Sequence, residues 1–321
     1  MSLEIDNLTL ARADGIPLLG PVSLRLDPGD RLALVGESGS GKSLLVSALF
    51  GTLPPGVRQK AGSIRAFGVL MDRPSAFRDR IRGARMGWVP QEPGQALNPL
   101  LSLGEHLALL PGVHRRESTG RALARLAPLL ERLDLPTDRA FLQRFPHEAS
   151  GGQRQRICLA MALSCDPELI LLDEPTTALD SMAQAAFLNL VLELQGERNL
   201  GFLWITHNLA LASAACESLL ILYGGHALEA GPAAHLLTTP QHPYTTRLLD
   251  AARRQPSEES GFLAAPEHRP PGCPFQPRCP HLRPSCATWG PWQGSDRDGL
   301  RCEYVFSSIH SRHHAPPAAN A

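Results

Sequence analysis

A glycine-rich segment, GESGSGKS, constrains the fold of this 321-residue chain more than any other feature. It spans Gly36 to Ser43, after the apolar run RLALV and before SLLVSALFGTL, which has a helical pattern. The segment matches G-x-x-x-x-G-K-[ST], in which glycines let the backbone wrap so that its N–H groups point at phosphate oxygens. The positive end of the following helix faces the same charges. The sequence therefore predicts a strand–loop–helix unit that binds phosphate groups.

Each residue of this loop is a candidate contact to ATP. Lys42 supplies a mobile positive charge, and the hydroxyl of Ser43 can ligate Mg²⁺. A glycine-rich turn that precedes a helix by chance is the alternative, and such a match in a chain of this length arises on the order of once in a hundred. The predicted ATP-binding residues of the loop are Gly36, Glu37, Ser38, Gly39, Ser40, Gly41, Lys42 and Ser43.

Two acidic residues follow a second apolar strand pattern, in the segment LILLDEP. Carboxylates at the end of a buried strand are costly unless they face a cation or a reaction. We therefore expect Asp173 to hold Mg²⁺ and Glu174 to act as the general base that polarises the attacking water. His207 follows the strand pattern GFLWIT, at the strand end where open α/β sheets bind ligands, and we expect it to contact the γ-phosphate and the attacking water. Surface acids and a structural histidine are the alternatives for these residues taken singly.

The order of strand and helix patterns predicts the fold. LEIDNLTLA and VSLRLDPGDRLALV alternate apolar and polar residues, with a turn at Pro28-Gly29-Asp30, and indicate antiparallel N-terminal strands. Beyond them, strand and helix patterns alternate, which favours a mostly parallel sheet covered by helices. We expect an α/β P-loop NTPase fold in residues 1–250 with a helical subdomain at about 92–165, a small Cys-rich extension in 251–310, and a disordered tail in 311–321.

Composition argues against several classes of protein. The formal net charge is +0, so no global basic field favours a nucleic acid partner, and none is expected. The N-terminal MSLEIDNLTL carries acids where a signal peptide needs Lys or Arg. No stretch reaches the roughly 18 uncharged apolar residues that a spanning helix requires. We therefore expect a cytoplasmic protein that is soluble or associated with a membrane through a partner.

A third motif, FPHEASGGQRQR, narrows the class of P-loop protein. Its SGGQ opens a helical pattern, so that the Ser150 hydroxyl and the glycine N–H groups form a second anion-binding helix start. A chain that already has one phosphate cradle has a use for a second one at a dimer interface, where it would close over the ATP of a partner subunit.

With these motifs in this order, residues 1 to about 250 resemble the nucleotide-binding subunits of ABC transporters. The resemblance implies ATP and Mg²⁺ as ligands, with Gln91 as the lid glutamine that touches Mg²⁺ and contacts the transmembrane partner. It also implies that His207 is the switch histidine and that Asp180, in TALD, communicates between the two sites. The residues implied to bind the γ-phosphate of the opposite subunit are Ser150, Gly151, Gly152 and Gln153.

Four further segments resemble the ATPases of importers for dipeptides, oligopeptides and nickel: GTLPPGVRQKAGSI, PQEPGQALNPL, HPYT and GCPFQPRCP. The resemblance implies import of di- or oligopeptides. The implied partners are a second ABC ATPase subunit (a homologue or a second copy), two transmembrane permease subunits and an extracytoplasmic solute-binding protein. Import of nickel or a metallophore, and a non-transport ABC ATPase, are the alternatives.

Three positions depart from the family pattern. Ala149 stands where the signature usually has Leu, and Asn208 replaces the usual Asp after the switch histidine. The family often stacks an aromatic residue on adenine near Ala11 and Arg12, and this segment has none, which leaves Arg12 as the candidate.

The seven cysteines fall into two groups. Cys158, Cys165 and Cys216 lie in apolar segments and are expected in the core. The other four follow the spacing C-x5-C-x6-C-x15-C in a segment too poor in apolar residues to fold without a staple. A cytosolic compartment disfavours disulfides, and zinc prefers paired C-x2-4-C ligands. The resemblance to the C-terminal extension of oligopeptide-importer ATPases favours a [4Fe–4S] cluster, with zinc, unligated thiols and a redox or metal-sensing module left open. The residues of this site are Cys273, Cys279, Cys286 and Cys302.

Overall fold

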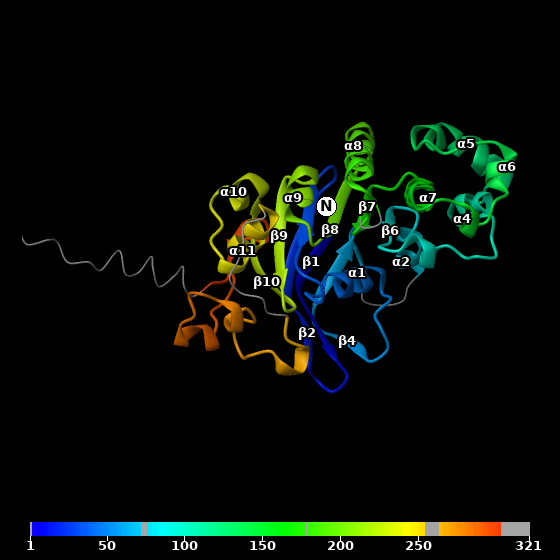
Figure 1. Cartoon of the computed structure of the whole chain (residues 1–321). Helices are drawn as coiled ribbons and strands as arrows, with labels where there is room; N and C mark the ends of the chain where they lie inside the picture. Colours follow the sequence, from blue (N-terminus) through cyan, green and yellow to red (C-terminus); the bar gives the residue numbers. More distant parts are fainter. Residues whose placement is uncertain (1, 72–75, 177–178, 254–262, 303–321) are drawn as a thin grey trace, which may run out of the picture.

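The computed structural model describes residues 2–71, 76–176, 179–253 and 263–302. Helices and strands alternate along these ranges and form two sheets with helices packed around them (Figure 1). The tail predicted for 311–321 lies outside the described residues.

The N-terminal strands form a small antiparallel sheet, as predicted. Strand β1 (Leu3–Arg12) pairs on one side with β2 (Pro17–Leu26) and on the other with β4 (Val57–Ala66), and β5 (Val69–Leu70) forms the edge. Apolar side chains of β1 and β2 face inward and join α1 (Lys42–Phe50) in a shared core, whereas the polar side chains between them face outward. The small sheet therefore covers the face of the main sheet on which α1 lies.

The main sheet has the strand order β11-β12-β10-β9-β3-β8-β7-β6 within the described residues. From β9 to β6 all neighbours are parallel, which confirms the predicted mostly parallel sheet. The central strands β7 and β8 are buried along their whole length, as expected for parallel strands covered on both faces. The strands are β3 (Arg31–Val35), β6 (Met86–Val89), β7 (Leu169–Asp173), β8 (Gly201–Thr206), β9 (Ser218–Tyr223), β10 (His226–Pro232), β11 (Gln293–Gly294) and β12 (Gly299–Leu300).

The helices that follow β6 and precede β7 in the chain form a group of their own, on one side of the molecule (Figure 1). Ser102 starts the first long helix of this group with a capping box, in which its hydroxyl accepts from the backbone N–H of Glu105. The group consists of α3 (Pro93–Ala96), α4 (Leu103–Arg115), α5 (Thr119–Arg132), α6 (Arg139–Leu142) and α7 (Gly151–Leu163). The remaining helices are α2 (Ala76–Ile81), α8 (Ser181–Arg198), α9 (Leu209–Ala215), α10 (Ala233–Thr238) and α11 (Pro243–Ala252).

The C-terminal extension, residues 263–302, packs onto the main domain, on the side opposite the helical group (Figure 1). Its hairpin, β11 and β12, joins the main sheet because β12 pairs with β10. Phe275 and Trp289 are buried and belong to the same hydrophobic cluster as the central strands. The extension therefore gains apolar contacts that its local sequence does not show, because it packs against a distant surface of the chain, and the expected staple stays a prediction.

The expected core positions of three cysteines are confirmed, because Cys158, Cys165 and Cys216 are all buried.

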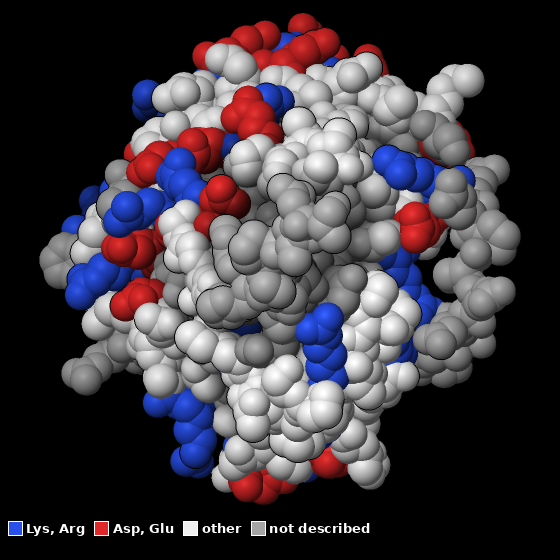
Figure 2. Space-filling view, turned by 90° about the vertical axis from the view of Figure 1, so that its left-hand side faces the viewer, with Lys and Arg blue, Asp and Glu red and all other residues white. Residues whose placement is uncertain are grey.

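On the face that carries the extension, basic and acidic side chains are interspersed rather than gathered by sign (Figure 2). Within the described part of the chain, no helix combines the length and the apolar character needed to cross a membrane.

Candidate nucleotide-binding and catalytic site

The P-loop, Gly36–Ser43, connects β3 to α1 and depends on its glycines. Gly39 and Gly41 have φ angles of +78° and +105°, a region that other residues rarely adopt. A Cβ atom on Gly36 would lie 2.1 Å from the carbonyl oxygen of Leu222, in the neighbouring strand. The backbone can therefore wrap this tightly only with glycine at these positions, as a phosphate cradle requires.

Lys42 is buried against the loop that it follows. Its Nζ atom donates to the carbonyl oxygens of Gly36 at 2.7 Å and Glu37 at 3.0 Å, and lies 4.0 Å from a carboxylate oxygen of Glu174. Burial lowers the pKa of Lys42, while the negative charges of Glu174, Asp173 and Glu37 oppose that shift. The ammonium group is thus held at the point where the P-loop meets the two acids of LILLDEP.

Asp173 ends β7 as a buried carboxylate. Burial and the neighbouring charge of Glu174 raise its pKa to about 6, and the positive charge of Lys42 opposes this rise. Asp173, Ser43 and Gln91 all line one cavity of about 560 Å³, together with side chains of α7. A carboxylate, a hydroxyl and an amide oxygen around one space are the oxygen ligands that Mg²⁺ takes, so this donor set fits the ion.

Glu174 lies at the meeting point of the predicted site residues. Its carboxylate is 3.1 Å from Nδ1 of His207, 3.5 Å from Nε2 of Gln91 and 4.0 Å from Nζ of Lys42. Its backbone has a φ of +44°, and its N–H donates to the carbonyl oxygen of Ile205 at 2.8 Å. A non-glycine residue in this region is strained, by roughly 1–3 kcal/mol, and such strain persists where neighbours fix the conformation. The fold therefore holds this carboxylate in one orientation.

His207 and Asn208 follow β8 at the same edge of the sheet. His207 has an exposed side chain, so the ring that meets Glu174 is also open to the outside. Asn208 caps α9, with its side-chain oxygen accepting from the N–H of Leu211 at 3.1 Å. Asparagine is as good an N-cap as aspartate, so the departure from the family pattern preserves this helix start.

The signature segment starts α7. The Ser150 hydroxyl accepts from the N–H of Gln153 at 3.2 Å, and the side-chain oxygen of Gln153 accepts from the N–H of Ser150 at 3.0 Å, a capping box. A Cβ atom on Gly151 or Gly152 would meet nothing within 4 Å, so packing inside the chain does not require these glycines. Ala149, where the family usually has Leu, is buried. The signature thus lies at the start of α7 with open space beside its glycines, and the P-loop lies at the start of α1; Figure 1 shows these two helices.

Asp180 caps α8. One of its carboxylate oxygens accepts from the N–H groups of Met182 at 3.0 Å and Ala183 at 2.9 Å. Thr177 and Ala178 of the same TTALD segment lie outside the described residues. The capping contact accounts for an aspartate at this position through local structure, and the inter-site role stays a prediction.

Arg12, the candidate for adenine stacking, is engaged by two carboxylates. Its guanidinium lies 2.7 Å from Asp14 and 2.9 Å from Glu267 of the extension. Both pairs are well exposed to solvent and are therefore worth little to stability. The contact places Glu267 of the extension beside the end of β1, the strand expected to contact the adenine ring of ATP.

Two residues that the sequence did not assign to the site contact the P-loop. The N–H of Glu37 donates to the hydroxyl of Tyr244 at 3.0 Å, and the Glu37 carboxylate accepts from Arg278 at 2.8 Å and 3.1 Å. Tyr244 belongs to HPYT and Arg278 to GCPFQPRCP, so the sequence marked both segments only by resemblance. No local pattern marks these side chains, because their partner lies more than 200 positions away in the chain.

The four cysteines of the extension lie near one another, and three are buried. Burial, together with the neighbouring thiols of Cys302, Cys286 and Cys279, raises the pKa of the Cys273 thiol to about 12. Among the described residues, no group of three or more His, Cys, Asp or Glu side chains is arranged to hold a metal ion. The arrangement therefore gives no support to a metal site at these cysteines, and the iron–sulfur cluster stays a prediction.

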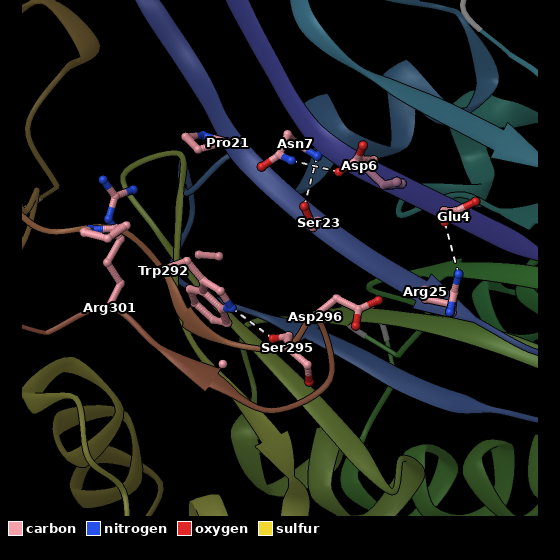
Figure 3. Close-up of a pocket in the computed structure, with 14 residues that line it drawn as sticks. Glu4, Asp6, Asn7, Pro21, Ser23, Arg25, Trp292, Ser295, Asp296 and Arg301 are labelled. Carbon is pink, nitrogen blue, oxygen red and sulfur yellow. Dashed lines mark hydrogen bonds and ion pairs between the residues drawn. The ribbon is translucent and has the colours of Figure 1, made fainter.

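A second cavity, of about 720 Å³, lies between strands β1 and β2 and the end of the extension (Figure 3). An ion pair between Arg25 and Glu4 lies along it, and the indole N–H of Trp292 donates to the carbonyl oxygen of Ser295 at 2.9 Å. The residues that line it include none of the predicted site residues. The predicted nucleotide site at the P-loop edge of the main sheet is therefore separate from this cavity.

A P-loop after β3, the Asp173–Glu174 pair at the end of β7 and a signature helix in the helical group define an ATP-binding cassette. Comparison with known proteins agrees: the family described as ABC transporter matches residues 19–177, and that described as oligopeptide/dipeptide transporter, C-terminal region, matches residues 228–286. The chain belongs to the ATP-binding subunits of ABC transporters, in the oligopeptide and dipeptide group, and is an ATP-hydrolysing transporter subunit.

Individual relatives cover most of the chain. The oligopeptide transport ATP-binding protein OppD of Salmonella typhimurium is 35% identical over 308 residues, which is 93% of this chain and 92% of the relative. A putative peptide import ATP-binding protein of Brucella ovis is 36% identical over 317 residues, 91% of this chain and 92% of the relative. A dimeric ATP-binding cassette solved in a post-hydrolysis state with ADP and Pi is 26% identical with a TM-score of 0.62, and the match covers 72% of this chain and 98% of that structure.

Proposed function

We propose that this chain supplies the energy for import of di- or oligopeptides by hydrolysing ATP at the site around Glu174. The observation that carries the proposal is the convergence of Lys42, Gln91 and His207 on the Glu174 carboxylate. The peptide substrate is supported by the names of the relatives and by the matching C-terminal region. Nickel or metallophore import by the same machinery is the second candidate, because the resemblance in sequence includes nickel importers.

In this proposal the residues around Glu174 have distinct tasks. The P-loop N–H groups and Lys42 bind the phosphates, and Ser43, Gln91 and Asp173 hold Mg²⁺, which neutralises charge on the phosphate oxygens. Glu174 accepts the proton of the attacking water, as a general base must. His207 orients the Glu174 carboxylate, since the two side chains are within hydrogen-bond distance. Asp180 relays the state of one site to the other.

We propose further that each complete site needs two subunits. The signature residues Ser150, Gly151, Gly152 and Gln153 would bind the γ-phosphate of the opposite subunit, and the open space around the two glycines supports a group from outside. The second subunit is a homologue or a second copy. ATP then holds the two subunits together, and hydrolysis lets them separate.

The transport partners follow from this role. We propose two transmembrane permeases, which contact the chain at Gln91 and the helical subdomain, and an extracytoplasmic solute-binding protein. The chain would lie at the cytoplasmic face of the cell membrane. The proposed division is a nucleotide-binding domain in residues 1–250, with the helical subdomain at about 92–165, and the extension in 251–310.

Transport in vesicles tests the function. The chain is reconstituted with its permeases, second ATPase subunit and solute-binding protein, and ATP turnover is measured with peptides of two to five residues and with nickel complexes. We expect peptides to stimulate turnover and to accumulate in the compartment that contains the ATPase. Stimulation by nickel complexes and not by peptides would replace the first candidate with the second, and turnover unaffected by either would contradict both.

A [4Fe–4S] cluster on Cys273, Cys279, Cys286 and Cys302 stays a prediction, and no step of the proposed mechanism uses it. Iron analysis of protein prepared without oxygen decides the question. Bound iron with absorbance near ~400 nm, lost when the four cysteines are replaced by serine, would support a cluster. Iron-free, colourless protein would end the prediction.

A further inference from the structure

Arg278, in the C-terminal extension, forms a two-point ion pair with Glu37 of the P-loop. Its Nη1 and Nη2 atoms lie 2.8 Å and 3.1 Å from the two carboxylate oxygens. Nη1 also donates to the hydroxyl of Tyr223 at 3.1 Å, and the arginine is only 9% exposed. A two-point guanidinium–carboxylate pair fixes direction as well as distance. This contact therefore orients the side chain of Glu37.

The backbone of Glu37 is held as well. Its N–H donates to the hydroxyl of Tyr244, and its carbonyl oxygen accepts from Nζ of Lys42 at 3.0 Å. Three groups thus restrain one residue of the P-loop, and one of them is the lysine proposed to bind the phosphates. A displacement of Glu37 would move a hydrogen-bond acceptor of Lys42.

An aromatic cluster surrounds the Arg278 end of the ion pair, whereas the Glu37 side chain is 32% exposed. The ring centroids of Tyr223 and Tyr244 are 4.5 Å apart, and the ring of Phe275, from the extension, lies 5.3 Å from each. All three rings are buried. Apolar surroundings strengthen a charge pair and make an unpaired charge costly. Loss of the Glu37 carboxylate would therefore leave the buried Arg278 charge unpaired, and loss of Arg278 would release the Glu37 side chain from its fixed position.

We propose that Arg278 is a positioning residue for ATP hydrolysis. Through Glu37 it sets the conformation of the P-loop and the place of Lys42, so that the extension is part of the nucleotide site. The inference rests on the proposed ATP site at the P-loop and adds to it a residue that touches neither the phosphates nor the attacking water.

A second arginine of the extension provides a matched comparison. Arg297 lies 2.6 Å from Asp27 and 2.9 Å from Asp30, in the turn before β3. Both arginines dock the extension onto the main domain, and of the two Arg278 is the one that contacts the P-loop. If both arginines only dock the extension, replacing either one should change the KM for ATP equally. If Arg278 positions the P-loop, replacing Arg278 should change the KM and replacing Arg297 should not.

The test compares the full-length variants Arg278→Gln and Arg297→Gln, each assembled with its partner subunits. We expect Arg278→Gln to raise the KM for ATP about tenfold, as for the loss of one charge-assisted hydrogen bond, with a smaller change in kcat. Arg297→Gln should leave the KM unchanged. A wild-type KM in Arg278→Gln, or the same rise in both variants, would overturn the proposal.

The variant Glu37→Gln tests whether Arg278 acts on the P-loop through Glu37. Because Arg278 acts through Glu37, the double variant Arg278→Gln/Glu37→Gln should have the KM of Glu37→Gln alone. A KM in the double variant that equals the product of the two single-variant increases would overturn the proposal. If Arg278→Gln does not fold, Arg278→Lys decides, since lysine keeps the charge and loses the two-point geometry. A wild-type KM in folded Arg278→Lys would count against positioning. Failure of the ATP site itself is distinguishable, because Lys42→Ala would then bind ATP as tightly as wild type.

Discussion

The Nδ1 atom of His207 lies 3.1 Å from a carboxylate oxygen of Glu174. The two residues end different strands, and their backbones come together only because β7 and β8 are parallel neighbours. Glu174 has a strained backbone, with a φ of +44°, and its carboxylate lies beside both His207 and Lys42. A carboxylate restrained in this way suits a general base that must meet one water molecule in one place.

Replacement of Glu174 by Gln should separate ATP binding from hydrolysis. Glutamine keeps the size of the side chain but cannot accept the proton of water, so we expect turnover to fall by about 10²–10⁴-fold while ATP binding is retained. Single-turnover hydrolysis and equilibrium ATP binding measure the two properties. Glu193→Gln, on the exposed face of α8, is the control and should hydrolyse at the wild-type rate. Normal turnover in Glu174→Gln would assign the base elsewhere.

Lys42→Ala should impair the binding of ATP itself, unlike Glu174→Gln, which should bind ATP but not hydrolyse it. The ammonium group is the buried positive charge at the P-loop, and its loss leaves the phosphate charges without that partner. We expect ATP affinity to fall by about tenfold or more, as measured by equilibrium dialysis. Lys60→Ala, in the exposed part of β4, carries the same substitution without touching the loop. If both variants bind ATP equally well, the P-loop is not the phosphate site.

Ser150→Ala tests the shared site. It removes the cap of α7, which should cost about 1 kcal/mol of stability, and also a proposed contact to the ATP of the partner subunit. Ser102→Ala removes the same type of capping box from α4 and serves as the control. We expect similar losses in thermal stability but a loss of turnover in Ser150→Ala alone. Equal turnover in the two variants, or wild-type turnover that does not depend on protein concentration, would contradict a site built from two chains.

The stability of the folded chain should depend on pH through His242. This buried residue caps α11, with its Nδ1 accepting from the N–H of Tyr244 at 3.0 Å, and burial lowers its pKa from 6.5 to about 3. The folded state therefore binds fewer protons than the unfolded state between these values, so stability is present above pH 6.5 and is lost as pH falls toward 3. Burial lowers the pKa of His226 to about 4, which adds a slope of the same sign.

His242→Asn measures this contribution. Asparagine keeps an acceptor for the helix cap but does not titrate, so the free energy of unfolding should fall less steeply with acid than in wild type. Urea unfolding at a series of pH values provides the measurement. His268→Asn, at an exposed position of the extension, should retain the wild-type slope. An unchanged slope in His242→Asn would mean that the histidine is not buried in the neutral form.

The sequence alone determined the strand–loop–helix unit at Gly36–Ser43, the buried strand that ends in Asp173 and Glu174, and the mostly parallel sheet. These features follow from residue spacing and apolar periodicity within about ten neighbouring positions, where backbone conformation and side-chain type are directly linked. The cap at Ser150 belongs to the same class, because its partner is three residues away.

Only the tertiary structure decided which distant groups meet. Arg278 and Glu37 are separated by 241 positions, and no local pattern encodes their contact. The sequence placed His207 and Glu174 at one edge of the sheet, but only the structure gives the direct contact between them. The sequence likewise suggested that the Cys-rich segment needs a staple, whereas Phe275 and Trp289 are buried against the main domain. The physical reason is that burial and charge pairing depend on the surface that the rest of the chain presents, and that surface exists only after the strands have assembled in their final order.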